Sequence, residues 1–471
     1  MGPASSEFGG GAGWRGRTGG RSPRAGRRKR KSAGWQRRLV FEPLEPRRVL
    51  NGEAPHGLYP DEVFPAVDSY ADLVAADLNH DGALDLVTAG GGTGGSSISI
   101  SLGRGDGTFD APTKHNVGSA PETLAIGDLN GDTHPDVVVA NYLSKSISVL
   151  LGRGDGTLAA PVAYATGGKP RSLAVADLDR DGTADVVVAS AEASSGSYYR
   201  LSVFRGLGGG ALGTPTDYAL LRSPTGLAAA DVNGDLYPDI VLTQYLDDDN
   251  SALAVLLNQG NGALGAAAET VVPGWLSAVA VGDLNADGDA DLVLGNVRDQ
   301  TLGVRLGLGD GTFPAQVSYR TGLNAAGGLH GQRLVLADLN ADSKLDLVVA
   351  TEQENAVAVF LGRGDGSLAP FVQYPQGQFT SAVAVGDFNG DGLPDIVTQW
   401  NRDVSVLLNR GDGTFADGDA SATAMECAPV LRPTSTGTAC RTWRRRTSTT
   451  QRSSCSLGGV MGLSPVPPSN R

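Results

Sequence analysis

The chain has 471 residues, of which 67 are glycine and 6% are aromatic, and its formal net charge is −13. The chain contains 38 Lys+Arg and 51 Asp+Glu residues. Positions 1–56 hold 13 basic and 4 acidic residues, and positions 420–471 hold 7 basic and 1 acidic residue. The middle of the chain therefore keeps 18 basic and 46 acidic residues, a net charge of −28. A domain this acidic repels phosphate backbones, which argues against a nucleic-acid partner, and no apolar run reaches the roughly 18 residues of a transmembrane segment.

The chain begins with a basic segment, residues 1–56, whose Gly- and Arg-rich composition is typical of disordered polypeptide. Within it, Gly26–Lys31 has the composition of a nuclear localisation signal. The stretch Arg37–Leu50, however, resembles a short N-terminal motif of surface and secreted proteins from planctomycete-type bacteria, and this resemblance implies export. We therefore expect a secreted or cell-surface protein, in an environment whose millimolar calcium suits the loops described below.

A repeat of regular length follows. Within the second repeat, short apolar runs at Leu124–Asp128, Asp136–Ala140, Ser146–Leu151 and Pro161–Tyr164 are separated by Gly- and Asp-rich turns, which predicts four antiparallel strands and no helix. Each repeat contains an acidic nonapeptide, and these begin at Asp77, Asp128, Asp177, Asp231, Asp283, Asp338 and Asp387, with intervals of 51, 49, 54, 52, 55 and 49 residues. A period this long indicates stacked or radially arranged units.

Seven four-stranded sheets are typical of a β-propeller, which we predict for residues 60–417. The alternative is an open solenoid. After the last turn, Gly411–Phe415, no fourth strand is recognisable, whereas Phe64–Tyr70 ahead of the first repeat resembles one. An N-terminal strand that completes the last blade would close the ring and leave no bare sheet edge. The predicted fold is an all-β, seven-bladed propeller with disordered basic ends, residues 1–56 and 418–471, and all three cysteines lie in the second of these ends.

The nonapeptides follow the pattern Asp-x-Asn-x-Asp-Gly-x-x-Asp, which brings several hard oxygens to one side of a tight loop, as calcium requires. An EF-hand is excluded because Thr88 and Val139 stand where its twelfth-position Glu would be, inside predicted strands. Four loops have the turn-forming Gly at the sixth position, but Thr133, Leu236 and Ser343 replace it in the others, so we expect those three loops to bind more weakly. Asx-turns without metal are the alternative interpretation.

Up to seven calcium ions are thus expected, held by the side chains of the first, third, fifth and ninth loop residues and the main-chain carbonyl of the seventh. The candidate ligands are Asp77, Asn79, Asp81, Ala83 and Asp85; Asp128, Asn130, Asp132, His134 and Asp136; Asp177, Asp179, Asp181, Thr183 and Asp185; Asp231, Asn233, Asp235, Tyr237 and Asp239; Asp283, Asn285, Asp287, Asp289 and Asp291; Asp338, Asn340, Asp342, Lys344 and Asp346; and Asp387, Asn389, Asp391, Leu393 and Asp395.

These nonapeptides, each followed by a stretch close to Val-Leu-Leu-Gly-x-Gly-Asp-Gly-Thr-Phe, resemble FG-GAP (VCBS-type) repeats. The resemblance implies a calcium-stabilised propeller similar to the N-terminal propeller of integrin α-chains. It implies no single role, because that family includes adhesins, receptors, scaffold modules and a few enzymes.

Arg-Gly-Asp occurs four times, at Arg104–Asp106, Arg153–Asp155, Arg363–Asp365 and Arg410–Asp412. One interpretation is a ligand for integrins. We favour the other, in which Gly-Asp-Gly forms a tight hairpin turn and the Arg is incidental, because the equivalent turns Gln259–Gly262 and Leu308–Gly311 lack it.

The two faces of such a ring differ. The calcium loops and Gly-Asp-Gly turns share one face, while the loops between second and third strands and the connections between blades share the other. That second face varies most between repeats and holds seven aromatic residues, Tyr142, Tyr198, Tyr199, Tyr245, Trp275, Phe379 and Trp400. Rings on variable loops suit sugars and protein hot spots alike, although some of them can instead pack between blades.

We therefore expect a monomeric, calcium-binding extracellular module that binds a protein or polysaccharide partner through its second face. The five histidines form no recurrent pair with a nucleophile, so we expect no catalytic activity. The alternatives are a glycan-degrading enzyme built on the same ring and a purely structural module of a surface layer.

Overall fold

The computed structural model describes residues 64–65, 72–90, 95–192, 198–314, 316–320, 334–351, 355–376, 380–400 and 403–417. All of them belong to one unit of the chain, residues 58–471. Every regular element in these ranges is a β-strand, which confirms the predicted all-β class. The two ends that were predicted to be disordered lie outside the described residues.

The strands form seven antiparallel sheets, one per blade. Blades 1 to 3 comprise β2 (Leu73–Ala76), β3 (Asp85–Ala89), β4 (Ser97–Ser101) and β5 (Thr113–Asn116); β6 (Pro121–Gly127), β7 (Asp136–Asn141), β8 (Ser146–Leu150) and β9 (Val162–Ala165); and β10 (Lys169–Ala176), β11 (Asp185–Glu192), β12 (Tyr198–Phe204) and β13 (Thr216–Leu220). Blades 4 to 6 comprise β14 (Ser223–Ala230), β15 (Asp239–Tyr245), β16 (Asn250–Leu256) and β17 (Ala268–Pro273); β18 (Leu276–Gly282), β19 (Asp291–Asn296), β20 (Thr301–Arg305) and β21 (Val317–Arg320); and β22 (Leu334–Ala337), β23 (Asp346–Thr351), β24 (Ala356–Phe360) and β25 (Val372–Pro375). Blade 7 comprises β26 (Thr380–Gly386), β27 (Asp395–Trp400) and β28 (Asp403–Asn409), with the short strands β1 (Phe64–Pro65) and β29 (Phe415–Asp417).

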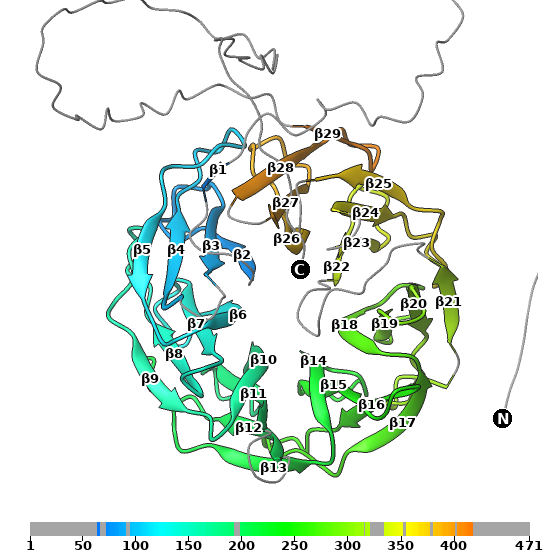
Figure 1. Cartoon of the computed structure of the whole chain (residues 1–471). Helices are drawn as coiled ribbons and strands as arrows, with labels where there is room; N and C mark the ends of the chain where they lie inside the picture. The colour runs from blue at the N-terminus through cyan, green and yellow to red at the C-terminus, as the bar shows by residue number, and fades with distance from the viewer. Residues whose placement is uncertain are drawn as a thin grey trace, which may run out of the picture. The chain divides into compact units, whose positions relative to one another are not determined.

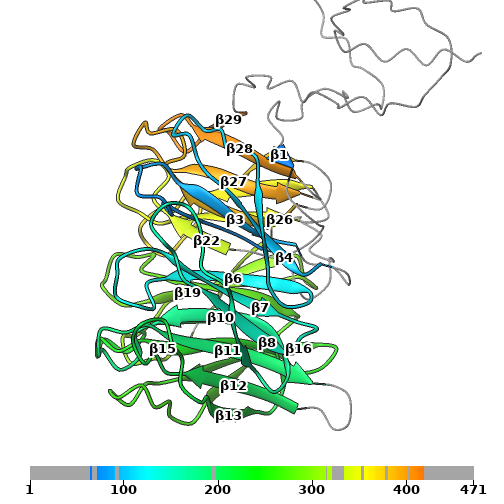
Figure 2. The same cartoon turned by 90° about the vertical axis from the view of Figure 1, so that its left-hand side faces the viewer.

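The blades stand in a ring, with the first strand of each blade innermost and the fourth outermost (Figure 1). The inner strands contact one another in sequence from β2 to β26, and β26 contacts β2 in turn. Figure 2 shows the blades from the side, where their connecting loops emerge on two faces. The seven-bladed ring predicted from the repeat is therefore confirmed, and the solenoid is excluded.

Closure of the ring takes place in blade 7. Strand β1 pairs with the free edge of β28, with Phe64 opposite Val404, as the sequence predicted. The sequence did not reveal β29, which pairs with the same edge of β28 and places Phe415 opposite Asn409. Strands β1 and β29 thus share the outermost position of blade 7. Each covers a part of the β28 edge that would otherwise be unpaired.

Burial explains the composition of the strands. The second strand of a blade is buried on both faces, so it contains a continuous apolar run, as β7 does. The third strand is buried as well, but β8 has Ser148 between apolar residues. The outer strands β9 and β25 are exposed except at one inward tyrosine. The hydroxyl of that residue accepts a hydrogen bond from the next blade, as Tyr164 does from the Leu212 N–H at 3.1 Å.

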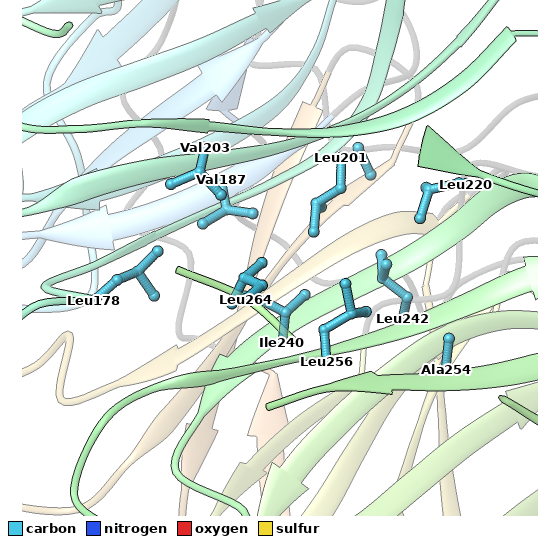
Figure 3. Close-up of a cluster of buried hydrophobic side chains, with 11 residues drawn as sticks. Leu178, Val187, Leu201, Val203, Leu220, Ile240, Leu242, Ala254, Leu256 and Leu264 are labelled. Atoms are coloured by element: carbon cyan, nitrogen blue, oxygen red, sulfur yellow. The ribbon is translucent and has the colours of Figure 1, made fainter. Parts of the chain in front are cut away.

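The hydrophobic core is divided into clusters that lie between neighbouring blades, seven of them among the described residues. Figure 3 shows the cluster between blades 3 and 4, in which Leu201 from β12 faces Leu242 and Leu256 from β15 and β16. A blade therefore buries its two faces against its neighbours, so a single blade is not expected to be stable alone.

Candidate functional site

The first acidic loop shows how the candidate ligands are held. The Asp77 carboxylate accepts the N–H groups of Asp81 and Gly82 at 3.2 and 3.0 Å. The side-chain oxygen of Asn79 accepts the Asp81 N–H at 3.0 Å, and the Asp81 carboxylate accepts the Ala83 N–H at 2.8 Å. The first, third and fifth side chains therefore all turn into the curve of the loop. The last of these contacts, from the seventh residue to the fifth, recurs in all seven loops.

The sixth position has a left-handed backbone in every loop. Its φ is 88° at Gly82, and it stays positive where the glycine is replaced, at 71° for Thr133 and Leu236 and 63° for Ser343. The turn geometry predicted for this position is confirmed. A side chain there, and a β-branched one above all, is strained.

The ninth aspartate of each loop is buried and links the loop to the turn of the same blade. In blade 1, Asp85 accepts the N–H of Leu78 in the loop at 2.8 Å and the N–H of Gly103 in the turn at 2.7 Å. The same two contacts recur at Asp136, Asp185, Asp239, Asp291, Asp346 and Asp395. The acidic loops and the Gly-Asp-Gly turns thus lie side by side on one face, as predicted.

These buried carboxyls lie close to other acidic side chains of the same loop. Burial raises the pKa of Asp85, the two N–H donors partly oppose the shift, and the carboxylates of Asp81 and Asp77 add to it. The same causes raise the pKa of Asp395 to about 6. Asp185 differs, because the nearby Arg205 opposes the shift. Carboxylates gathered in this way gain stability when a cation lies among them.

The donor sets fit calcium, since they consist of carboxylate and amide oxygens, which that ion prefers. In the third loop, one carboxylate oxygen each from Asp177, Asp179 and Asp181 lies within 4.8 Å of the others. Six loops have Asn at the third position instead of Asp, so they offer one carboxylate fewer there. Among the described residues, the set in the third loop is the one group of three acidic side chains that lies so close together, and it does not include the ninth aspartate of the loop.

The turns that contain Arg-Gly-Asp use their aspartate internally. The Asp106 carboxylate accepts the N–H and the hydroxyl of Thr108 at 3.0 and 2.6 Å. The same contacts from Thr157 lower the pKa of Asp155. This geometry is what the hairpin-turn interpretation requires.

The turns also connect neighbouring blades. The Gly156 N–H of blade 2 donates to the Leu78 carbonyl in the blade 1 loop at 3.1 Å, and equivalent bonds from Gly107, Gly210, Gly311 and Gly366 join four more pairs of blades. In blades 4 and 7 an Asn side chain does this instead, with Asn258 donating to the Leu178 carbonyl and Asn409 to the Leu339 carbonyl, both at 2.7 Å. A belt of hydrogen bonds therefore runs round the ring through the acidic loops.

The opposite face carries an aromatic and charged cluster at blades 4 and 5. Tyr245 and Trp275 meet edge to face, with ring centroids 6.2 Å apart. The Trp275 Nε1–H donates to the Asp248 carbonyl at 2.9 Å, and the Arg298 guanidinium lies 5.9 Å from the centre of the indole ring. Tyr245 also donates its hydroxyl to the Asp248 carboxylate at 2.7 Å. Both rings are half-buried, so one part of each is anchored and another faces solvent.

A second cluster on this face lies at blades 2 and 3. The Lys169 Nζ is 4.7 Å and the Arg171 guanidinium carbon 5.2 Å from the centre of the Tyr142 ring. Burial raises the pKa of Glu122 to about 7, against the opposing charges of Arg171 and Lys169. Three of the seven predicted aromatics thus reach the face as expected.

The other four predicted aromatics are not placed on this face. Tyr199 packs against the core between blades 3 and 4. Phe379 and the side chains of Tyr198 and Trp400 lie outside the described residues. The repeat pattern predicted that all seven rings lie on the second face, but it could not show that the Tyr199 ring packs against the core.

Sequence reasoning missed one pair of histidines. His80 in the first loop and His134 in the second lie 2.6 Å apart, from Nε2 to Nδ1, with their ring centroids 4.8 Å apart. They are 54 positions apart in sequence, so only the ring brings the two loops together. His80 is exposed and His134 is half-buried, both on the face of the acidic loops.

Two solved structures illustrate the fold. The BP39L lectin from Burkholderia pseudomallei is 17% identical, with a TM-score of 0.54, and the match covers 74% of this chain and 98% of the lectin. A candidate 6-phosphogluconolactonase from Bacteroides uniformis is 16% identical, with a TM-score of 0.51, and the match covers 76% of this chain and 95% of that protein. At these identities the likeness shows the fold alone.

The repeat itself is more informative. None of the curated proteins matches the chain. The pattern of the FG-GAP-like repeat matches residues 77–139, 128–188, 231–294, 283–349 and 338–398, which together are more than half of the chain. Each match runs from one acidic loop through the second strand of the next blade, which is the unit whose geometry recurs above. The chain therefore belongs to the family of FG-GAP-like repeat proteins.

Proposed function

We propose that this protein is an extracellular binding module, stabilised by calcium in its acidic loops, that takes a protein or polysaccharide ligand on its opposite face. The observation that carries the proposal is the Tyr245–Trp275 pair. The indole is anchored by the Asp248 carbonyl and lies beside the exposed Arg298. An anchored, half-exposed indole with charged groups beside it offers a flat apolar surface and hydrogen-bonding partners at one place, which suits sugars and protein hot spots.

Two further points support the calcium and export parts of the proposal. FG-GAP-like repeats often bind calcium and occur in extracellular proteins. The loops gather hard oxygen donors, and burial with neighbouring like charges raises the pKa of their ninth carboxyls. Within the described ranges, no helix has the length and apolar character to cross a membrane.

The proposed ligand site is tested by glycan arrays and surface plasmon resonance, which compare wild type with Trp275→Ala in calcium and in EGTA. We expect the substitution to weaken binding at least tenfold, since loss of a central aromatic contact costs about 2 kcal/mol or more. Tyr199→Phe is the matched control, because that ring packs against the core and we expect no effect on binding. Equal affinity of wild type and Trp275→Ala would move the ligand site elsewhere.

The same arrays separate the alternatives. Binding without cleavage supports a binding module, and turnover abolished by one substitution on the loop face would support a glycan-degrading enzyme instead. If no soluble ligand is found, a structural role in a surface layer becomes the better interpretation. The calcium part is tested by melting in excess EGTA, where an unchanged melting temperature would contradict it.

A further inference from the structure

Blade 3 differs from the other six blades at two positions, one in its acidic loop and one just before its turn. The third position of the loop is Asp179, where the other loops have Asn. The residue just before the turn of the same blade is Arg205, where the other blades have Leu102, Leu151, Leu257, Leu306, Leu361 and Leu408. An additional acid in the loop is thus accompanied by a base from the neighbouring turn.

The six leucines show where this side chain lies. Each covers a turn glycine of the following blade: a Cβ added to Gly156 would lie 2.8 Å from Leu102, and one added to Gly311 would lie 2.8 Å from Leu257. Arg205 covers Gly262 of blade 4 in the same way. The arginine therefore occupies the place of the leucine, and its longer side chain brings a guanidinium to the loop.

The contacts of the guanidinium join the loop to the next blade. Its Nη1 donates to the Asp179 carboxylate and lies 3.4 Å from the buried Asp185 carboxylate. Its Nη2 donates to the Asn261 carbonyl in the turn of blade 4. A second link crosses the same boundary, where the Arg180 guanidinium lies 5.6 Å from the centre of the Tyr237 ring.

We propose that Arg205 supplies the cation of the third loop, so that this loop needs no metal ion and the boundary between blades 3 and 4 stays closed when calcium is removed. The convergence of Asp177, Asp179 and Asp181 alone would favour a metal. However, Asp179 is engaged by a guanidinium, which is always charged and presents its donors in a fixed plane. None of the five segments that match the family pattern contains Arg205. The inference rests on the proposed function, because it contrasts this loop with others that bind calcium.

Lys344 in the sixth loop is a weaker case of the same kind. Its Nζ contacts the Asp342 carboxylate at 3.0 Å, but the contact is to one carboxylate and the lysine side chain is 39% exposed, against 28% for Arg205. The fifth and seventh loops, which keep Asn and Gly at the third and sixth positions, are therefore the better references.

Hydrogen exchange of the whole protein, followed by mass spectrometry in calcium and in EGTA, tests the proposal. At calcium about 100 times its Kd, we expect exchange in residues 283–291 and 387–395 to slow by up to about 100-fold, and exchange in residues 177–185 to change by less than about twofold. Equal slowing in all three loops would overturn the proposal. If no loop responds, the calcium part of the proposed function itself fails, and the contrast fails with it.

A reciprocal pair of variants gives a second, independent measurement. Asp179→Asn with Arg205→Leu gives blade 3 the residues of the other blades, and we expect bound calcium, counted by equilibrium dialysis, to rise by one ion per chain. Asn285→Asp with Leu306→Arg moves the arginine arrangement to blade 5 and is expected to remove one ion. Unchanged stoichiometry in both variants would refute the proposal.

Discussion

The buried aspartate of each acidic loop is open to a direct test at Asp291. Its carboxylate accepts the N–H of Leu284 at 2.9 Å and the N–H of Gly307 at 2.8 Å, so it joins loop and turn in blade 5. Asp291→Asn replaces one carboxylate oxygen with an NH2 group that faces a donor. One buried N–H then loses its partner, which costs about 1–3 kcal/mol. Asp291→Ala leaves both N–H groups unpaired, and we expect about twice that loss.

The cost should depend on calcium, because the carboxylate also carries charge. Burial raises the pKa of Asp291, and the carboxylates of Asp287 and Asp283 add to that shift. In EGTA, Asp291→Asn therefore relieves repulsion while it breaks a hydrogen bond, so we expect a net cost near 1 kcal/mol, at the lower end of the range for an unpaired N–H. In calcium the variant also loses an ion ligand, and the cost should reach about 3 kcal/mol, as for a charged hydrogen bond.

Urea unfolding followed by circular dichroism, in EGTA and in calcium, measures both values. Asp310→Asn is the matched control, since this exposed carboxylate accepts the N–H and hydroxyl of Thr312 within its own turn. We expect the control to cost less than about 1 kcal/mol and to be independent of calcium. An equal cost of Asp291→Asn in both conditions would refute the link between this residue and the ion, and no cost in either would refute the structural tie.

Three further predictions follow from single residues. Thr133→Gly removes a β-branched residue at a φ of 71°, and we expect a gain of up to about 1 kcal/mol in urea unfolding, because the relief of strain exceeds the entropy that glycine adds to the unfolded chain; a lower midpoint would contradict this. Burial raises the pKa of Glu122 from 4.5 to about 7, so the stability it contributes is complete below pH 4.5 and is lost as the pH rises through 7. Glu122→Gln should therefore flatten the dependence of melting temperature on pH between about 4.5 and 7, and a slope equal to that of wild type would count against the buried carboxyl. Phe415→Ala removes a buried ring that packs edge-on against Tyr374 with centroids 5.5 Å apart, and we expect a loss of about 3–5 kcal/mol in urea unfolding; a loss below about 1 kcal/mol would mean that β29 does not hold the last blade.

The local architecture follows from the sequence alone. The alternation of apolar runs with Gly- and Asp-rich turns places four strands in each repeat, and the observed β6 to β9 agree with the predicted ranges of the second repeat to within three residues. The sharp turn at the sixth loop position and the pairing of an N-terminal strand with the last blade were also predicted from the pattern. These features depend on residues close together in the chain or on a repeat that the chain displays seven times, so they can be read without knowing the neighbours in space.

The contacts between one blade and the next could not be predicted from the repeat. The pairing of Arg205 with Asp179 joins positions 26 apart, and its contact with Asn261 joins positions 56 apart. The meeting of His80 with His134, the burial of Tyr199 and the second closing strand β29 likewise depend on the curvature of the ring. Charge compensation and burial depend on an environment that two blades form together, whereas the repeat specifies the residues of one blade at a time.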